Sequence, residues 1–180
     1  MDKSCFELRY IGIADGAKDN WTFLSKHTTT QVLDFFHASE YVAKVAEAIY
    51  SNKEKKALFM TKSCHKLKYE ENGAKELLSE FTEYRKKKIN TQKKEKLESA
   101  ITYFKNQIAK MNYSMYLEKN IPIGSGVTEA ACKVIVKQRL CNSGMKWKKQ
   151  GAETVLCLRA LNYSSSRWIQ SWNKICKYRF

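Results

Sequence analysis

The stretch IPIGSGVTEAACKVIVKQR, residues 121–139, decides how the rest of this chain is interpreted. Pro122 ends whatever element precedes it, and residues 124–126, Gly-Ser-Gly, form a loop from which a helix can begin. Ser125 or Thr128 can cap the first turn of that helix, because each carries a hydroxyl that accepts backbone N–H groups. The following residues have helical periodicity, so we expect a helix over most of the stretch.

Glu129 falls in the first turn of this expected helix, and Lys133 and Lys137 follow it at i+4 and i+8, on the same face. The positive end of the helix dipole stabilises Glu129 as an anion. An ionised carboxylate beside cationic side chains suits a metal ligand close to a phosphate backbone. The alternative is an ordinary Glu-to-Lys pairing on a solvated helix, and this stretch alone leaves both interpretations open.

The charge of the chain indicates a polyanionic partner. Among 180 residues, 33 are Lys or Arg and 18 are Asp or Glu, a net charge of +15. Such an excess favours nucleic acid first and an anionic membrane surface second. The sequence contains no run of about 18 apolar residues, the length that a membrane-spanning helix needs.

The cysteines and the N-terminus indicate the compartment. The six cysteines are widely scattered and form no Cys-x-x-Cys pair, which gives no support to a zinc ribbon or a thioredoxin-type site. The first residues, MDKSCFELRYIGIADG, lack the apolar segment of a signal peptide. We therefore expect a reduced, cytoplasmic protein.

Two short apolar runs near the N-terminus, 6–14 and 31–36, have the composition of strands. A short helix is expected over about 21–26, between them, and a longer one over about 38–50. The order strand, helix, strand, helix predicts part of an α/β sheet. Asp15 then lies at the end of the first strand, where ligands bind in parallel sheets, unless Asp-Gly is simply a turn.

The rest of the chain predicts helices. Residues 53–111 are rich in Lys and Glu, contain no proline and predict about three helices, which we interpret as a helical insertion in a single partial domain, 1–180. Another helix is expected over 151–163. Beyond it, Trp168 and Trp172 stand among basic residues, where they either close a small core or stack on bases.

Several segments together resemble the bacterial insertion-sequence transposases of the ISKra type, which belong to the DDE group. The resemblance runs from about Tyr10 to Trp172, and its most specific part is the GSGVTEAACK segment with the GMKW that follows it. The segments are IADGAKDNW (13–21), VLDFFHASEYV (32–42), YFKNQIAKMNY (103–113), IPIGSGVTEAACKVIVKQRL (121–140) and GMKW (144–147).

This resemblance implies an RNase H-like fold and cleavage and strand transfer of DNA by metal-bound carboxylates. Asp15 matches the second aspartate of the family's Asp-Asp-Glu set and Glu129 the glutamate, so both are expected to be catalytic and to hold Mg²⁺ or Mn²⁺. Asp34 and His37 match an Asp-x-x-His element that several DDE families carry.

The implied partner is double-stranded DNA, both the transposon ends and the target. On spacing and charge, the expected phosphate contacts are Lys133, Lys137, Arg139 and Lys146.

The first aspartate of the family has no counterpart here. Only Asp2 precedes Asp15, and it lies in the approach to the same strand. We therefore expect an α/β, predominantly helical, truncated RNase H-like fold that keeps about two short strands. We also expect no activity unless a missing N-terminal half is supplied, with homo-oligomerisation as the other partner option. The alternative function is a non-catalytic basic DNA-binding remnant.

Overall fold

The structure, a computed structural model, describes residues 10–86 and 90–178. The chain packs as two compact units, Met1–Ser125 and Gly126–Phe180, and each is described by itself below. The expectation of a single domain over 1–180 stays a prediction.

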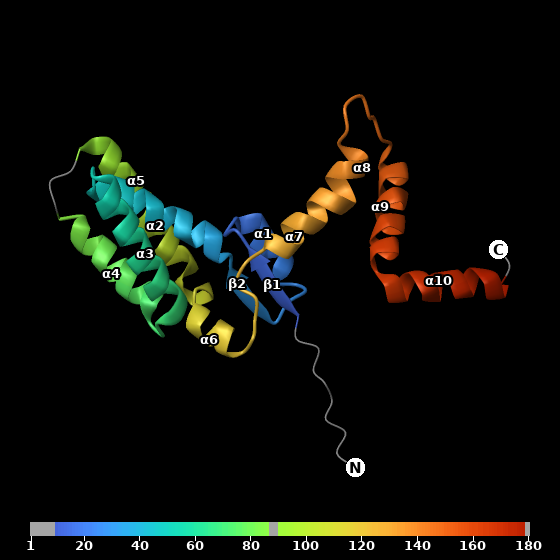
Figure 1. The fold of residues 1–180 in the computed structure, drawn as a ribbon, viewed down its shortest axis with the longest axis horizontal. Coiled ribbons are helices and arrows are strands. Elements are labelled where there is room, and N and C mark those ends of the chain that lie inside the picture. Colours follow the sequence, from blue (N-terminus) through green and yellow to red (C-terminus); the bar gives the residue numbers. More distant parts are fainter. Residues whose placement is uncertain (1–9, 87–89, 179–180) are drawn as a thin grey trace, which may run out of the picture. The chain divides into compact units, whose positions relative to one another are not determined.

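The first unit contains a small parallel sheet. Strand β1 (Ile11–Ala14) pairs with β2 (Thr30–Leu33) in parallel, with Ile11 opposite Thr30 and Ala14 opposite Leu33. Helix α1 (Lys18–Leu24) lies in the connection between them (Figure 1). Parallel pairing requires a long crossover connection, usually a helical one, because both strands must start at the same end of the sheet.

The second strand is shorter than the sequence predicts, and the first can be compared with its prediction only from residue 10 onward. Residues 6–9 of the first predicted strand lie outside the described residues. The second predicted strand, 31–36, ends at Leu33 because the carboxylate of Asp34 caps a helix there, so Phe35 and Phe36 form its first turn. This helix, α2 (Phe35–Ile49), begins three residues earlier than expected.

Four helices, α2 to α5, form a bundle beside the sheet (Figure 1). Helix α2 packs against α3 (Lys53–Tyr69) and α5 (Thr91–Gln107), and α4 (Gly73–Tyr84) packs against the same two helices. The three helices expected within 53–111 are thereby confirmed. A short 3₁₀ turn, η1 (Ile108–Lys110), and α6 (Tyr113–Glu118) follow and lead back to the sheet.

The core of the first unit extends from between these four helices to strand β2. Phe81 of α4 and Phe104 of α5 are fully buried and meet edge to face, with ring centroids 5.1 Å apart. Burial of such rings away from water is the main favourable contribution to folding. The other fully buried apolar residues include Val32, Leu33, Val42, Val45, Leu77 and Leu97.

The second unit is helical throughout its described residues. Helix α7 (Gly126–Ala131) continues into a π-helical segment, η2 (Cys132–Lys137), and then into α8 (Gln138–Leu140). Helices α9 (Lys149–Tyr163) and α10 (Ser165–Tyr178) follow. None of the described residues of this unit is buried, and the tail tryptophans, Trp168 and Trp172, are exposed instead of closing a core.

Helices account for 73% of the structure, and the described residues contain only the one two-stranded sheet. The fold class, α/β and predominantly helical, is thereby confirmed. Within the described ranges, no helix has the length and apolar character needed to span a membrane. The five cysteines in these ranges are all free thiols.

The close contact between α3 and α4 allows the packing of the four-helix bundle to be tested. A Cβ atom at Gly73 would lie 2.1 Å from the carbonyl oxygen of Lys66, so Gly73→Ala should lower the free energy of unfolding by about 1–3 kcal/mol, the usual cost of overpacking. Gly151→Ala is the control, because its nearest atom lies 3.9 Å away and alanine favours helix. Urea unfolding measures both, and equal stabilities for the two variants would contradict the close approach.

Candidate functional site at the strand ends

Asp15 follows β1 directly and is exposed to solvent. Its Oδ1 atom accepts hydrogen bonds from the backbone N–H of Ala17, at 3.0 Å, and from Nδ2 of Asn20, at 2.9 Å. These two bonds, assisted by the charge of His37, lower the pKa of Asp15 below its ordinary value. The side chain is therefore an ionised, oriented carboxylate at the sheet edge where ligands bind in parallel sheets.

Helix α5 fixes the turn that carries Asp15. The hydroxyl of Tyr103 donates to the carbonyl oxygen of Asp15 at 2.7 Å, and Nε2 of Gln107 donates to that of Gly16 at 3.1 Å. Gly16 has a φ of +97°, a conformation that glycine adopts without the strain other residues would suffer. A Cβ at Gly16 would also lie 3.0 Å from the Tyr103 hydroxyl oxygen.

Asp34 occupies the equivalent position at the end of β2, but it is buried, with 1% of its surface exposed. Its Oδ1 accepts from the backbone N–H groups of Phe36, at 2.7 Å, and His37, at 3.3 Å. Its Oδ2 accepts from the backbone N–H of Ser125, at 2.6 Å, and from the hydroxyl of Ser125. Burial by itself raises the pKa of Asp34, but the donated bonds outweigh it and the pKa lies below its ordinary value.

The loop before residue 126 is bound to the same strand end by further contacts. The N–H of Phe35 donates to the carbonyl of Ile123 at 2.8 Å. Gly124 lies against the Phe36 ring, since a Cβ there would be 3.2 Å from the ring. Residues 123–125 therefore lie beside the first turn of α2 within the first unit.

Parallel pairing brings Asp15, Asp34 and His37 to one edge. Asp34 donates its N–H to the carbonyl of Ala14 at 2.8 Å, so the residues after the two strands are neighbours. His37 is partly exposed, and its Nδ1 lies 3.5 Å from a carboxylate oxygen of Glu40. The structure thus gathers three of the residues predicted from the sequence, one from each of two strand ends and one from a helix start.

Sequence reasoning missed Tyr103 and Gln107. The two are separated by four positions and therefore share a face of α5. That spacing could have marked them as a polar pair on an amphipathic helix. Nothing in the local sequence says that this face meets the turn after β1, because the contact joins residues 88 and 91 positions apart.

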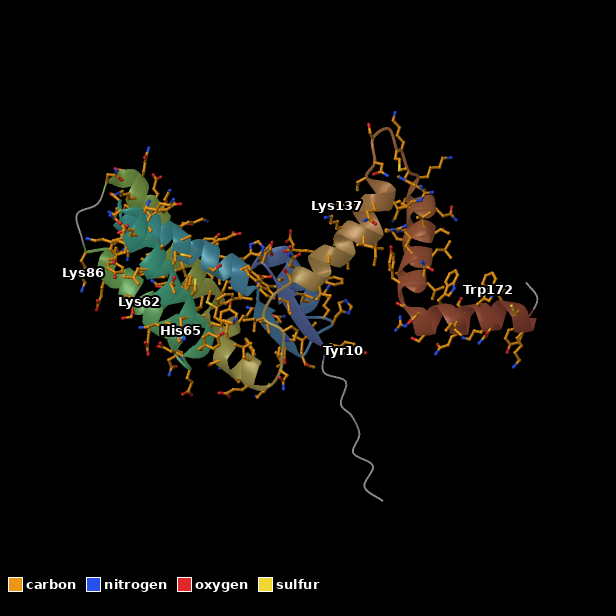
Figure 2. The ribbon with its side chains drawn as sticks, viewed as in Figure 1. Tyr10, Lys62, His65, Lys86, Lys137 and Trp172 are labelled. Atoms are coloured by element: carbon orange, nitrogen blue, oxygen red, sulfur yellow. The ribbon has the colours of Figure 1, made fainter. Side chains whose placement is uncertain are left out.

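The remaining predicted site residues lie in the second unit. Glu129 is exposed on α7, and the expected phosphate contacts, Lys133, Lys137, Arg139 and Lys146, are exposed as well. Figure 2 shows Lys137 at the end of the π-helical segment η2 and Trp172 on α10.

The π-helical segment changes the face on which these side chains lie. An α-helix returns to the same face after four residues, whereas a π-helix closes each hydrogen bond one residue later. The i, i+4, i+8 spacing of Glu129, Lys133 and Lys137 therefore does not define one straight face, since Cys132–Lys137 is wound more widely. A local widening of this kind is not visible in the residue pattern.

Arg159 of α9 supports the π-helical segment. Its Nε donates to the carbonyl of Ile135 at 2.9 Å and its Nη2 donates to the carbonyl of Val134 at 2.6 Å. The planar guanidinium thus bonds two consecutive carbonyls of the widened turn. This is the best-defined polar contact between α9 and the helix that carries Glu129.

The positive charge of the chain is concentrated in the second unit. Residues 126–180 hold eleven Lys and Arg residues, with Glu129 and Glu153 as their acidic residues, so this unit supplies +9 of the chain's +15. The guanidinium of Arg139 lies over the Trp147 ring, 5.7 Å from its centroid. Clustered, exposed cations with an aromatic neighbour suit phosphate backbones.

The described residues do not by themselves fit a divalent metal centre. In the described ranges, no three His, Cys, Asp or Glu side chains are grouped so that they could hold an ion. Both oxygens of Asp34 already accept two hydrogen bonds each, which leaves Asp15 as the accessible carboxylate at the strand ends.

In comparisons with known proteins, no family model, curated protein or solved structure matches this chain.

The contact between α9 and the π-helical segment can be tested directly. Arg159→Met keeps the length of the side chain but removes both bonds. We therefore expect the free energy of local opening of the segment to fall by about 1.5–3 kcal/mol, the range for hydrogen bonds of charged groups. Hydrogen exchange of the amides of residues 134–140 measures this change. Arg167→Met on α10 is the control for lost charge, and equal exchange in the two variants would contradict the role of Arg159.

Proposed function

We propose that this chain is part of a DDE-type transposase with an RNase H-like domain, whose complete form cuts DNA and transfers strands. The observation that carries the proposal is the position of Asp15, an exposed and ionised carboxylate at the carboxyl end of a parallel strand. The segment around it is one of those that resemble the family, and the cationic second unit supplies the charge that a DNA partner requires.

The open edge of the sheet supports a domain that continues beyond these two strands. The carbonyls of Tyr10 and Ala14 accept hydrogen bonds from the β2 side. Because successive residues of a strand direct their backbone groups to opposite sides, Ile11 and Ile13 direct theirs away from β2, where the described residues place no third strand. Further strands at this edge, from an N-terminal half or another copy, would satisfy these groups.

The metal ligands are assigned by the same proposal. Asp15 and Glu129 would hold Mg²⁺ or Mn²⁺, which prefer carboxylate oxygens, together with a carboxylate from the missing half. Asp34 is not included, because its oxygens are already saturated by N–H and hydroxyl donors.

Reconstitution tests the enzymatic proposal. The chain alone should not nick supercoiled plasmid DNA in Mg²⁺, whereas the chain joined to the polypeptide encoded directly upstream should do so. Activity should fall at least a hundredfold in Asp15→Asn and in Glu129→Gln, because each removes a metal ligand. Asp19→Asn, on α1, is the control.

Two outcomes would contradict this proposal. Nicking by the chain alone that is lost in Glu129→Gln would show that the site is complete without a further half. Nicking by the reconstituted protein that survives Asp15→Asn would show that Asp15 is no ligand.

The second candidate is a non-catalytic DNA-binding protein, favoured by the charge of the second unit. Binding through phosphates should weaken linearly with the logarithm of the salt concentration. Lys146→Gln with Lys148→Gln should reduce that slope by up to about 1.8, at about 0.9 per lost phosphate contact. Lys53→Gln with Lys55→Gln, exposed lysines of α3, removes the same charge from the first unit and should change the slope less.

Fluorescence anisotropy with a labelled duplex measures these slopes. An affinity that barely changes between low and physiological salt would exclude both candidates as charge-driven DNA binders. Equal slopes for the two double variants would show that net charge alone, and not the second unit, drives binding.

A further inference from the structure

Asp34 differs from Asn52 and Asn90, two other side chains that cap helices in the described part of the chain. Asn52 and Asn90 cap α3 and α5, each with one amide oxygen that accepts one N–H, from Lys55 at 3.0 Å and from Lys93 at 2.9 Å. Both asparagines are exposed. Asp34 caps α2 with one oxygen only, and its second oxygen bonds Ser125, 91 positions further along the chain.

The second pair of bonds explains why a carboxylate stands at this position. An asparagine could cap α2 through its amide oxygen. Its NH₂ group would then face the N–H of Ser125, donor against donor, inside a site with 1% exposure. A buried donor left without an acceptor is costly, so the contact to Ser125 requires the second oxygen.

We propose that Asp34 is a positioning residue, and that its bonds to Ser125 form a latch which fixes, at the end of β2, the loop that ends at Ser125. Ser125 immediately precedes Gly126, the first residue of α7, and Glu129 follows three residues later. The latch needs no metal ion, because every donor to Asp34 is an N–H or hydroxyl group of this chain. Its catalytic consequence rests on the function proposed above.

The same geometry divides the Asp-x-x-His element into two roles. Asp34 fixes the backbone of His37, whose N–H donates a hydrogen bond to Oδ1 of Asp34. The imidazole of His37 is partly exposed and lies close enough to Asp15 to contribute to the lowering of the pKa of Asp15. Asp34 therefore acts through Ser125 and His37 and does not itself touch a ligand.

Hydrogen exchange of the full chain, without DNA, tests the latch. Asp34→Asn and Ser125→Ala should each lower the protection of the Ser125 amide at least tenfold and leave the amides of α3 to α5 unchanged. Ser125→Ala removes only the hydroxyl bond to Oδ2 and keeps the backbone N–H bond, whereas Asp34→Asn disrupts both. Because the hydroxyl bond is affected by both changes, the double variant should lower the protection by much less than the product of the two single effects. Ser125→Thr, which keeps the hydroxyl and the N–H, should retain the protection.

The controls separate the latch from a general loss of stability. Ser39→Ala removes a hydroxyl from α2 that donates to the carbonyl of Phe36 at 2.7 Å, and it should leave the Ser125 amide protected. Effects of Asp34→Asn and Ser125→Ala that multiply independently would overturn the proposal. If Asp34→Asn does not fold, unequal protection in Ser125→Ala and Ser125→Thr supports the latch, and equal protection overturns it.

Two further measurements decide between positioning and other roles. Mg²⁺ added to the wild type should leave the protection of Ser125 unchanged, and an increase that Asp34→Asn abolishes would make Asp34 a metal ligand instead.

In the reconstituted protein, Ser125→Ala should lower kcat for nicking tenfold or more with KM for DNA unchanged, and Ser125→Thr should restore it. Loss of protection with an unchanged kcat would reduce the latch to a stabilising contact. A reconstituted protein without activity would count against the proposed function, while the exchange data still decide whether the latch forms.

Discussion

The buried carboxylate of Asp34 is the interaction on which the arrangement of the strand ends in the first unit depends. A charge with 1% exposure is stable only where hydrogen bonds replace its lost hydration, and Asp34 has four such donors. They come from the first turn of α2 and from Ser125, while the backbone of Asp34 pairs with β1. One side chain thus joins a strand end, a helix start and a loop from a distant part of the chain.

Two neighbouring aspartates follow two neighbouring strands, and their surroundings separate their roles. Asp34 is saturated by donors and is structural. Asp15 is exposed, and one of its carboxylate oxygens accepts hydrogen bonds from Ala17 and Asn20. Tyr103 and Gln107 of α5 donate to the backbone carbonyls of its turn. A carboxylate that is ionised, oriented and accessible can bind a cation, and for that reason Asp15, not Asp34, carries the functional proposal.

The two units are stabilised in different ways. The first unit has a bundle of four helices that pack around buried aromatic and aliphatic side chains. The described part of the second unit has no buried residue, so its helices rely on their own backbone bonds and on contacts such as Arg159 with the π-helical segment. Helices with little burial are marginal in water, and a cationic surface of this kind gains most from a partner that neutralises its charge.

The sequence by itself predicted the helices, the strand–helix–strand order and the place of Asp15 at the end of a strand, because periodicity, turn residues and charge are local properties. It also indicated that Asp34 and His37 belong near a strand end. Only the tertiary structure decided that Asp34 is buried and bound to Ser125, that α5 supports the turn of Asp15, and that the Glu129 helix widens after Ala131. These features depend on contacts between residues far apart in the chain, and no local pattern specifies which distant donor a carboxylate will meet.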